Sequence, residues 1–147
     1  NPNSDIQVDA ELFLELVKKG SPADLEKALK LYRGHFFADE PMQEWLTARE
    51  QYLHDIFLKT AGMMTENYIQ QELYEKALDL TRRVLDGDRL YEPAFLQQLR
   101  IQHALGDIGA VRMAYSQFRN ATREFFGSDV SSECKTLYTE LSGETAK

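Results

Sequence analysis

The chain of 147 residues has a single cysteine, Cys134, so it cannot form an intrachain disulfide. One thiol without a partner suits a reducing cytoplasm better than an oxidising compartment. Long hydrophobic runs are missing too. The longest cover a few residues, such as Leu12 to Leu14, whereas roughly twenty are needed to cross a bilayer. These absences exclude a disulfide-stapled extracellular scaffold and predict no membrane contact.

Positive charge is also in short supply. The chain has 17 Lys and Arg against 24 Asp and Glu, a net charge of -7. Affinity for nucleic acid comes largely from neutralising phosphates with Lys and Arg, so we expect any DNA contact to be made elsewhere. With 43% hydrophobic and 28% charged residues, the composition is that of one ordinary globular domain.

Sequence motifs of metal-binding, phosphate-binding and catalytic sites are absent. The three histidines, His35, His54 and His103, are scattered, and there is no HExxH or CxxC pattern for a metal. No glycine-rich phosphate loop or GxSxG elbow occurs, and the carboxylates are typical of helix ends and solvated faces. We therefore expect no metal, no cofactor and no enzymatic activity.

The sequence is rich in strong helix formers, and no segment alternates apolar and polar residues long enough for a strand. Capping signals are clear: Ser21 precedes Pro22 and Asp24 at the start of one helix, and Ser131 precedes another. Gly62 lies inside a long helix, which predicts close packing there. The expected helices cover about residues 9–19, 22–33, 41–69, 73–85, 93–105, 108–126 and 132–141.

A shift of 34 residues superimposes apolar positions of the predicted helices. Thirty-four residues forming two helices and a turn are the signature of the tetratricopeptide repeat, with a small residue, here Ala77, where the helices cross. We therefore predict an all-α fold of about seven helices, with antiparallel pairs stacked as a tetratricopeptide-like right-handed superhelix. The matched pairs are Ala61 with Phe95, Thr65 with Leu99, Tyr74 with Ile108, Ala77 with Val111, Thr81 with Tyr115 and Val84 with Phe118.

The connection "HFFADEP" is too apolar for a free loop. We expect at least Phe36 to pack beneath Trp45 and close one end of the helical stack. The alternative is that Phe36 and Phe37 form a patch that binds a partner.

Two surfaces are candidates for binding. In stacked helix pairs the first helix of each repeat lines a concave wall. The second surface is a basic face, which would suit an acidic partner or nucleic acid; the alternative for both is a solvated helix surface. The groove candidates are Lys59, Glu66, Gln70, Leu96, Arg100 and His103, and the basic face consists of Arg112, Arg119 and Arg123.

The predicted helices and the motifs between them, in this order, resemble the bacterial transcriptional activator domain. This domain is the tetratricopeptide-like module of regulators of the Streptomyces antibiotic regulatory protein class. The resemblance runs from about Asp9 to Leu141. The chain departs from the family at Ser131, where a proline is common, and in helices poorer in Ala and Arg. The matching pieces are Ala28, Leu29, Leu31 to Gly34, Phe36, Asp39 and Trp45; Ala77 and Leu78; Asp88, Leu90 and Glu92; Gly106 and Asp107; and Gly127, Leu137 and Tyr138.

The resemblance implies a cytoplasmic regulatory module that binds protein: itself, as a homodimer, RNA polymerase, or its own DNA-binding domain. DNA would be bound only by a separate winged helix on the N-terminal side. The start "NPNSD" suggests a cut inside a longer protein. We expect a flexible linker or artificial segment at residues 1–8, the module at 9–142 and a disordered tail at 143–147.

Two other functions stay open at this stage. A free-standing tetratricopeptide scaffold would capture a peptide segment of a partner protein, without any link to transcription. A groove that senses a small ligand is a weaker alternative, because no sequence feature points to it.

Overall fold

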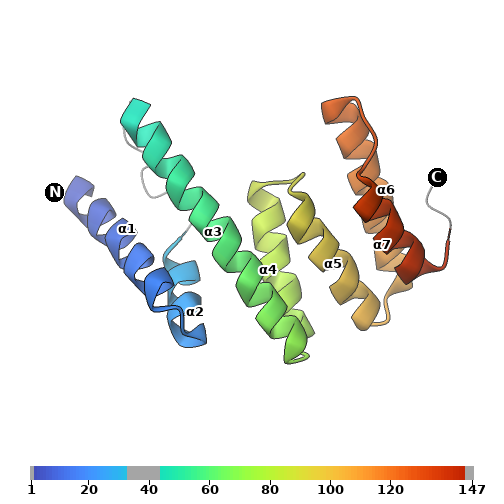
Figure 1. Cartoon of the computed structure of the whole chain (residues 1–147), viewed down its shortest axis with the longest axis horizontal. Helices are drawn as coiled ribbons and strands as arrows, with labels where there is room; N and C mark the ends of the chain where they lie inside the picture. The colour runs from blue at the N-terminus through green and yellow to red at the C-terminus, as the bar shows by residue number, and fades with distance from the viewer. Residues whose placement is uncertain (1, 33–43, 145–147) are drawn as a thin grey trace. The chain divides into compact units, whose positions relative to one another are not determined.

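The computed structural model describes residues 2–32 and 44–144, and side chains from residue 8 to 32 and from 47 to 144. These residues form helices and no strand, which confirms the all-α prediction (Figure 1). None of the described helices is both long and apolar enough to span a membrane. The helices are α1 (Pro2–Lys19), α2 (Pro22–Leu31), α3 (Glu44–Gln70), α4 (Tyr74–Gly87), α5 (Glu92–Ala104), α6 (Ile108–Phe126) and α7 (Ser132–Ser142).

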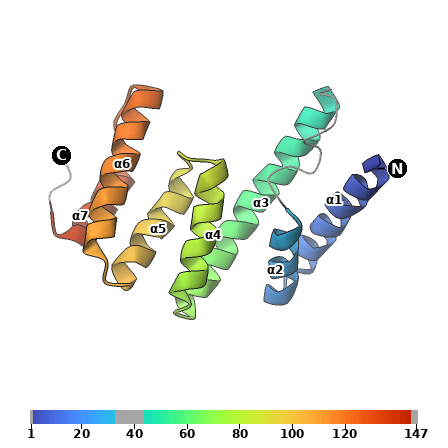
Figure 2. The ribbon, with the colours of Figure 1, turned by 180° about the vertical axis from the view of Figure 1, so that it is seen from behind.

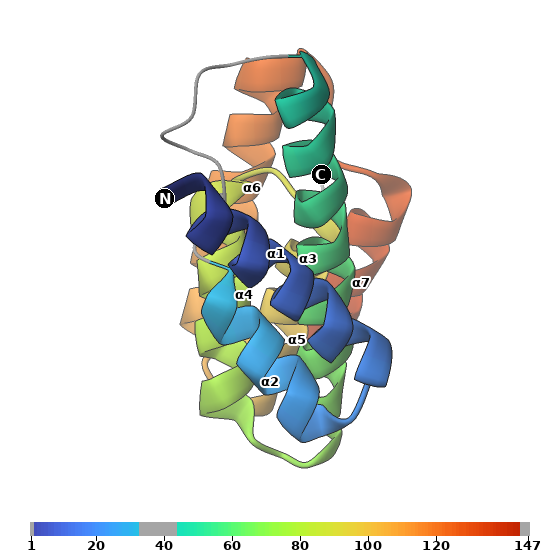
Figure 3. The same ribbon diagram turned by 90° about the vertical axis from the view of Figure 1, so that its left-hand side faces the viewer.

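The chain divides into two compact units, residues 1–64 and 65–147, and α3 contributes to both. In the first unit, α1 and α2 are antiparallel neighbours (Figure 3). Gly20, with φ +75°, makes the turn between them, as a residue without Cβ can at little cost. Ser21 then caps α2, as predicted: its Oγ accepts from the Asp24 N–H at 3.2 Å and donates to the Asp24 carboxylate at 2.7 Å.

The core of the first unit is built around Tyr32, which is fully buried. Its ring stacks on Phe57 with centroids 4.3 Å apart and lies 5.7 Å from Phe13. Its hydroxyl is 2.7 Å from Nδ1 of His54, so the polar end of the tyrosine is satisfied inside the cluster. His54 is therefore a partner in the core of this unit.

Two expectations concern the first unit. Helix α1 begins at Pro2 and not near Asp9. In α1, Leu12 is exposed, whereas Ala10 is buried. The packing of Phe36 beneath Trp45 lies outside the described residues and stays a prediction.

In the second unit α4, α5, α6 and α7 run antiparallel to their neighbours in the chain, with α5 between α4 and α6 (Figure 2). Capping residues mark the ends of these helices. Asp107 accepts from the Ala110 N–H at 3.0 Å, and the predicted cap Ser131 accepts from the Cys134 N–H at 3.1 Å. Gly127 ends α6 with φ +73°.

Burial confirms the 34-residue register in this part of the fold. In five of the six superimposed pairs both members are buried, and in the sixth, Tyr74 with Ile108, both are half-buried. Ala77 is fully buried against Leu78 and Ile101, where two helices approach closely. A small residue at this crossing is what the tetratricopeptide pattern requires.

The largest core cluster of the second unit joins α5, α6 and α7. Two nearly parallel aromatic pairs form its centre: Phe95 with Phe118, and Tyr115 with Tyr138, each with centroids 3.9 Å apart. Cys134 is fully buried here, and burial raises the pKa of its thiol to about 12. The thiol is thus protonated and unreactive at neutral pH.

Among the residues that the structure describes, the close packing predicted at Gly62 is not seen. A Cβ built on it meets no described atom within 4 Å, and the residue lies inside α3. Glycine inside a helix costs about 1 kcal/mol relative to alanine. We therefore expect Gly62→Ala to stabilise the chain by roughly 1 kcal/mol and to raise Tm by roughly 2 to 4 °C, measured by thermal and urea unfolding. An unchanged or lower Tm would show that a neighbour packs on this glycine after all.

Candidate protein-interaction site

Glu66, near the C-terminal end of α3, is the centre of a polar cluster with two side chains of α5. Arg100 donates to both carboxylate oxygens, from Nη1 at 2.5 Å and from Nη2 at 3.3 Å. Gln97, one turn earlier on α5, donates from Nε2 to Oε1 at 3.3 Å. Sequence analysis placed Glu66 and Arg100 on the same wall, and the structure brings them into contact.

Glu66 and Arg100 are 34 residues apart, so they occupy the same position in consecutive repeats. Their contact shows that the end of α3 and α5, the first helices of those repeats, lie side by side. The hydrogen bonds from Arg100 lower the pKa of Glu66, while partial burial raises it by less. The carboxylate is therefore ionised at neutral pH.

The Glu66–Arg100 ion pair is half-exposed, with 39% and 42% of the two side chains accessible. Solvent screening limits such pairs to about 0.2–1 kcal/mol. We expect this coupling energy from a double-mutant cycle of Glu66→Gln and Arg100→Gln, measured by urea unfolding at neutral pH. Because the folded pKa of Glu66 is lowered, the contribution should disappear as the pH falls below the carboxyl's ordinary range. A Glu140→Gln control, at an exposed position, should change little, and a coupling of zero would mean that the pair is not formed in solution.

The other predicted groove residues behave differently from one another. Gln70 and His103 are exposed, as a binding surface requires. Leu96, in contrast, packs against the core cluster of α5, α6 and α7, so it is part of the core. Lys59 is exposed but belongs to the first unit. Of the groove residues in the second unit, Glu66 and Arg100 contact each other, and Gln97 joins them.

The predicted basic face is occupied by carboxylates of the same chain. Asp129, in the turn between α6 and α7, accepts two hydrogen bonds from Arg119, both at 2.9 Å. Arg123 and Lys135 reach the same Oδ2 atom at 3.1 and 3.2 Å. The hydrogen bond from Arg119 is the main reason that the pKa of Asp129 lies far below its usual range. Arg119 and Arg123 therefore hold a turn of their own chain.

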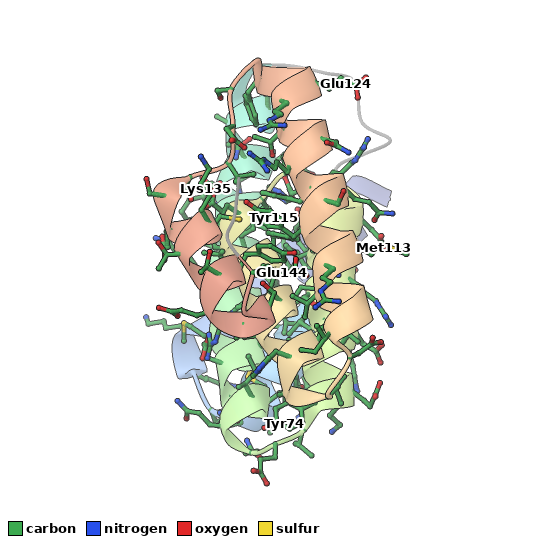
Figure 4. The ribbon with its side chains drawn as sticks, turned by 90° about the vertical axis from the view of Figure 1, so that its right-hand side faces the viewer. Tyr74, Met113, Tyr115, Glu124, Lys135 and Glu144 are labelled. Atoms are coloured by element: carbon green, nitrogen blue, oxygen red, sulfur yellow. The ribbon has the colours of Figure 1, made fainter. Side chains whose placement is uncertain are left out.

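Arg112, the third residue of the basic face, pairs with Glu144 through Nε and Oε1 at 2.9 Å. The other oxygen of Glu144 accepts from the Tyr138 hydroxyl at 2.9 Å. Tyr115 lies on the side of α6 that faces α7, and Glu144 lies beside these two helices (Figure 4). Glu144 was expected in a disordered tail, yet it joins the end of α7 to α6.

Sequence reasoning missed Gln97, Asp129 and Glu144. Gln97 could have been found, because it lies three residues before Arg100 on the same helix face. The contacts of Asp129 and Glu144 could not be predicted from the sequence. Both residues follow the end of a helix, and the fold of the chain there, not helical spacing, determines which side chains they meet. Among the described residues no three His, Cys, Asp or Glu side chains form a group that could hold a metal ion.

Stacked antiparallel helix pairs and a 34-residue register define a tetratricopeptide-like repeat module. The family model of the bacterial transcriptional activator domain matches residues 8–142, and the chain belongs to this family. Neither the curated proteins nor the solved structures give a match.

Proposed function

We propose that the chain is the regulatory module of a transcription activator in the bacterial cytoplasm, and that it works by binding protein. Three contacts fit this role: a second copy of itself, RNA polymerase, or its own DNA-binding domain. DNA would be bound by a separate N-terminal domain of the parent protein. The observation that carries the proposal is the family match over residues 8–142.

Two further observations support a protein partner. The net charge of -7 disfavours the phosphate backbone of nucleic acid. The polar wall of Glu66, Gln97 and Arg100 offers both a carboxylate and a guanidinium on adjacent helices, a surface that suits a polar peptide segment. We further propose that the module has no catalytic activity and needs no cofactor, because its sequence lacks the motifs for either.

The first test is in vitro transcription with the intact parent activator and a version lacking residues 9–141, with promoter occupancy followed by footprinting. Loss of transcript at unchanged occupancy would show that the module makes an activating contact. Loss of occupancy would show that it acts through dimerisation or on the DNA-binding domain. If neither changes, the proposed role is wrong, and a scaffold unrelated to transcription becomes the better explanation.

A point variant makes this test sharper. Arg100 and Arg112 are both exposed arginines, each paired with one glutamate of its own chain. If the wall formed by the first helices makes the activating contact, Arg100→Glu should lower transcript while the matched control Arg112→Glu does not. Equal effects of the two variants would count against the wall as the binding surface.

A further inference from the structure

A groove runs between α4 and the C-terminal half of α6, on the side of the second unit where the second helices of the two repeats lie. It consists of two adjoining hollows of about 780 and 550 Å³. Both hollows are lined by Arg89, Leu90, Ala121 and Glu124, so they are continuous. We call this feature the α4–α6 groove. It belongs to a different face from the wall of Glu66 and Arg100.

Two aromatic side chains line one end of the α4–α6 groove without being covered. Phe125 is 76% exposed and Phe126 60% exposed, and their rings meet edge to face at 4.9 Å. Adjacent exposed phenylalanines next to a hollow are unusual on a free protein surface, because each leaves a large apolar area in water. They have the features of an anchor that another protein buries.

We infer that the α4–α6 groove is a self-association surface, in which two copies of the chain bind each other around a twofold axis. The inference rests on the proposed function in one respect, because it selects self-association among the contacts proposed above. In a twofold dimer the same patch is used on both copies, so it must complement itself. Phe125 and Phe126 line the hollow and are exposed, so in such a dimer the pair of one copy can pack against the hollow of the other.

The charges around the groove also point to a second copy. Its charged lining residues carry both signs, from Arg82 and Arg89 and from Asp86, Asp88 and Glu124. On a chain with net charge -7, such a mixed patch is the place where an identical chain meets little repulsion. It offers no excess of one sign to favour a strongly basic or strongly acidic partner.

The geometry further selects the direction of the pairing. Arg89 follows α4 and Glu124 lies near the end of α6, so the two residues line the shared part of the groove from opposite sides (Figure 4 labels Glu124). A twofold axis along the groove places α4 of one copy against α6 of the other. Arg89 of each chain then meets Glu124 of the other, and two ion pairs flank the buried phenylalanines.

The test is sedimentation velocity of the full chain over a concentration series up to about 200 µM, well above typical Kd values for specific interfaces. We expect a species of twice the 17.0 kDa of one chain. Replacing both Phe125 and Phe126 by Ser should weaken dimerisation at least about tenfold, as loss of a central aromatic anchor does. The control is Met113→Ser, which removes an apolar side chain that is 64% exposed on the same helix but outside the groove.

Charge reversal tests the pairing itself. Arg89→Glu alone and Glu124→Arg alone should each dissociate the dimer, because like charges would meet twice. An equal mixture of these two variants should restore it as a heterodimer, since each interface then again pairs one acid with one base. Both positions are at the surface of the described chain, so circular dichroism should show unchanged folding.

Three results would overturn the inference. A wild-type chain that stays monomeric would overturn it. If the parent protein with serine at Phe125 and Phe126 then still lost activation, the groove would bind a different partner. A dimer that survives the serine and charge variants would use another surface. Failure of the mixed variants to associate would refute the pairing. The sedimentation and mixing results do not depend on the transcription assay, so failure of the proposed function would be seen separately.

Discussion

Phe95→Ala is expected to destabilise the chain by about 3–5 kcal/mol, the cost of truncating a fully buried aromatic side chain. Phe95 is buried in the core cluster of α5, α6 and α7, and its ring stacks on Phe118. Removing it leaves a cavity between two helices that carry the 34-residue register. Urea unfolding followed by circular dichroism measures the loss, and a variant that is unfolded at 25 °C can be replaced by Phe95→Leu.

The matched control is the same substitution at Phe125, which is exposed. Phe125→Ala should change the free energy of unfolding by no more than about 0.5 kcal/mol when measured at low protein concentration, where a dimer contributes little. The contrast between two identical side-chain truncations tests the register directly. Equal effects at Phe95 and Phe125 would mean that α6 is rotated relative to the core.

Sequence reasoning located the helices well because the signals that end them are local. Ser21, Asp107 and Ser131 each accept a hydrogen bond from an N–H three residues later, and this geometry depends on neighbouring residues alone. The internal repeat was equally accessible, since a fixed spacing of 34 residues places equivalent side chains in equivalent environments. The early start of α1 was missed although Pro2 is a residue typical of a first helical turn.

The exposure of Phe125 could not be predicted from the apolar pattern. The buried positions of α6 are Val111, Tyr115, Phe118 and Thr122, and the next step of three residues leads to Phe125. By period alone it belongs to the core. It is exposed because no described element covers this last turn of α6. The period of a helix specifies a face, whereas the length of the covering helices decides where burial ends.

The two polar clusters also differ in whether the sequence predicts them. The Glu66–Arg100 pair follows from the repeat, because equivalent positions of stacked helices lie side by side. The position of Asp129 depends on how the turn after Gly127 folds back, which no spacing rule contains. For this reason Arg119 and Arg123, which looked like part of a basic face, turned out to be paired with Asp129.

Replacing Asp129 by Asn should destabilise the second unit at neutral pH and remove part of its sensitivity to acid. The amide keeps the shape of the side chain and the oxygen that accepts from the Val130 N–H, but it removes the negative charge. Arg119, Arg123 and Lys135 would then repel one another around a neutral group. Loss of an ion-pair network of this kind loosens the turn that joins α6 to α7.

The sign of the pH effect follows from the lowered pKa of Asp129 in the folded chain. Its contribution is fully present above the carboxyl's ordinary pKa near 4 and is lost as the pH falls through the lower folded value. The difference in unfolding free energy between wild type and Asp129→Asn should therefore be constant from about pH 7 to 5 and shrink below about pH 4. Urea unfolding at several pH values measures it, with Asp79→Asn, at an exposed position, as the control. A difference that stays constant down to pH 3 would mean that the carboxylate charge is not what holds the turn.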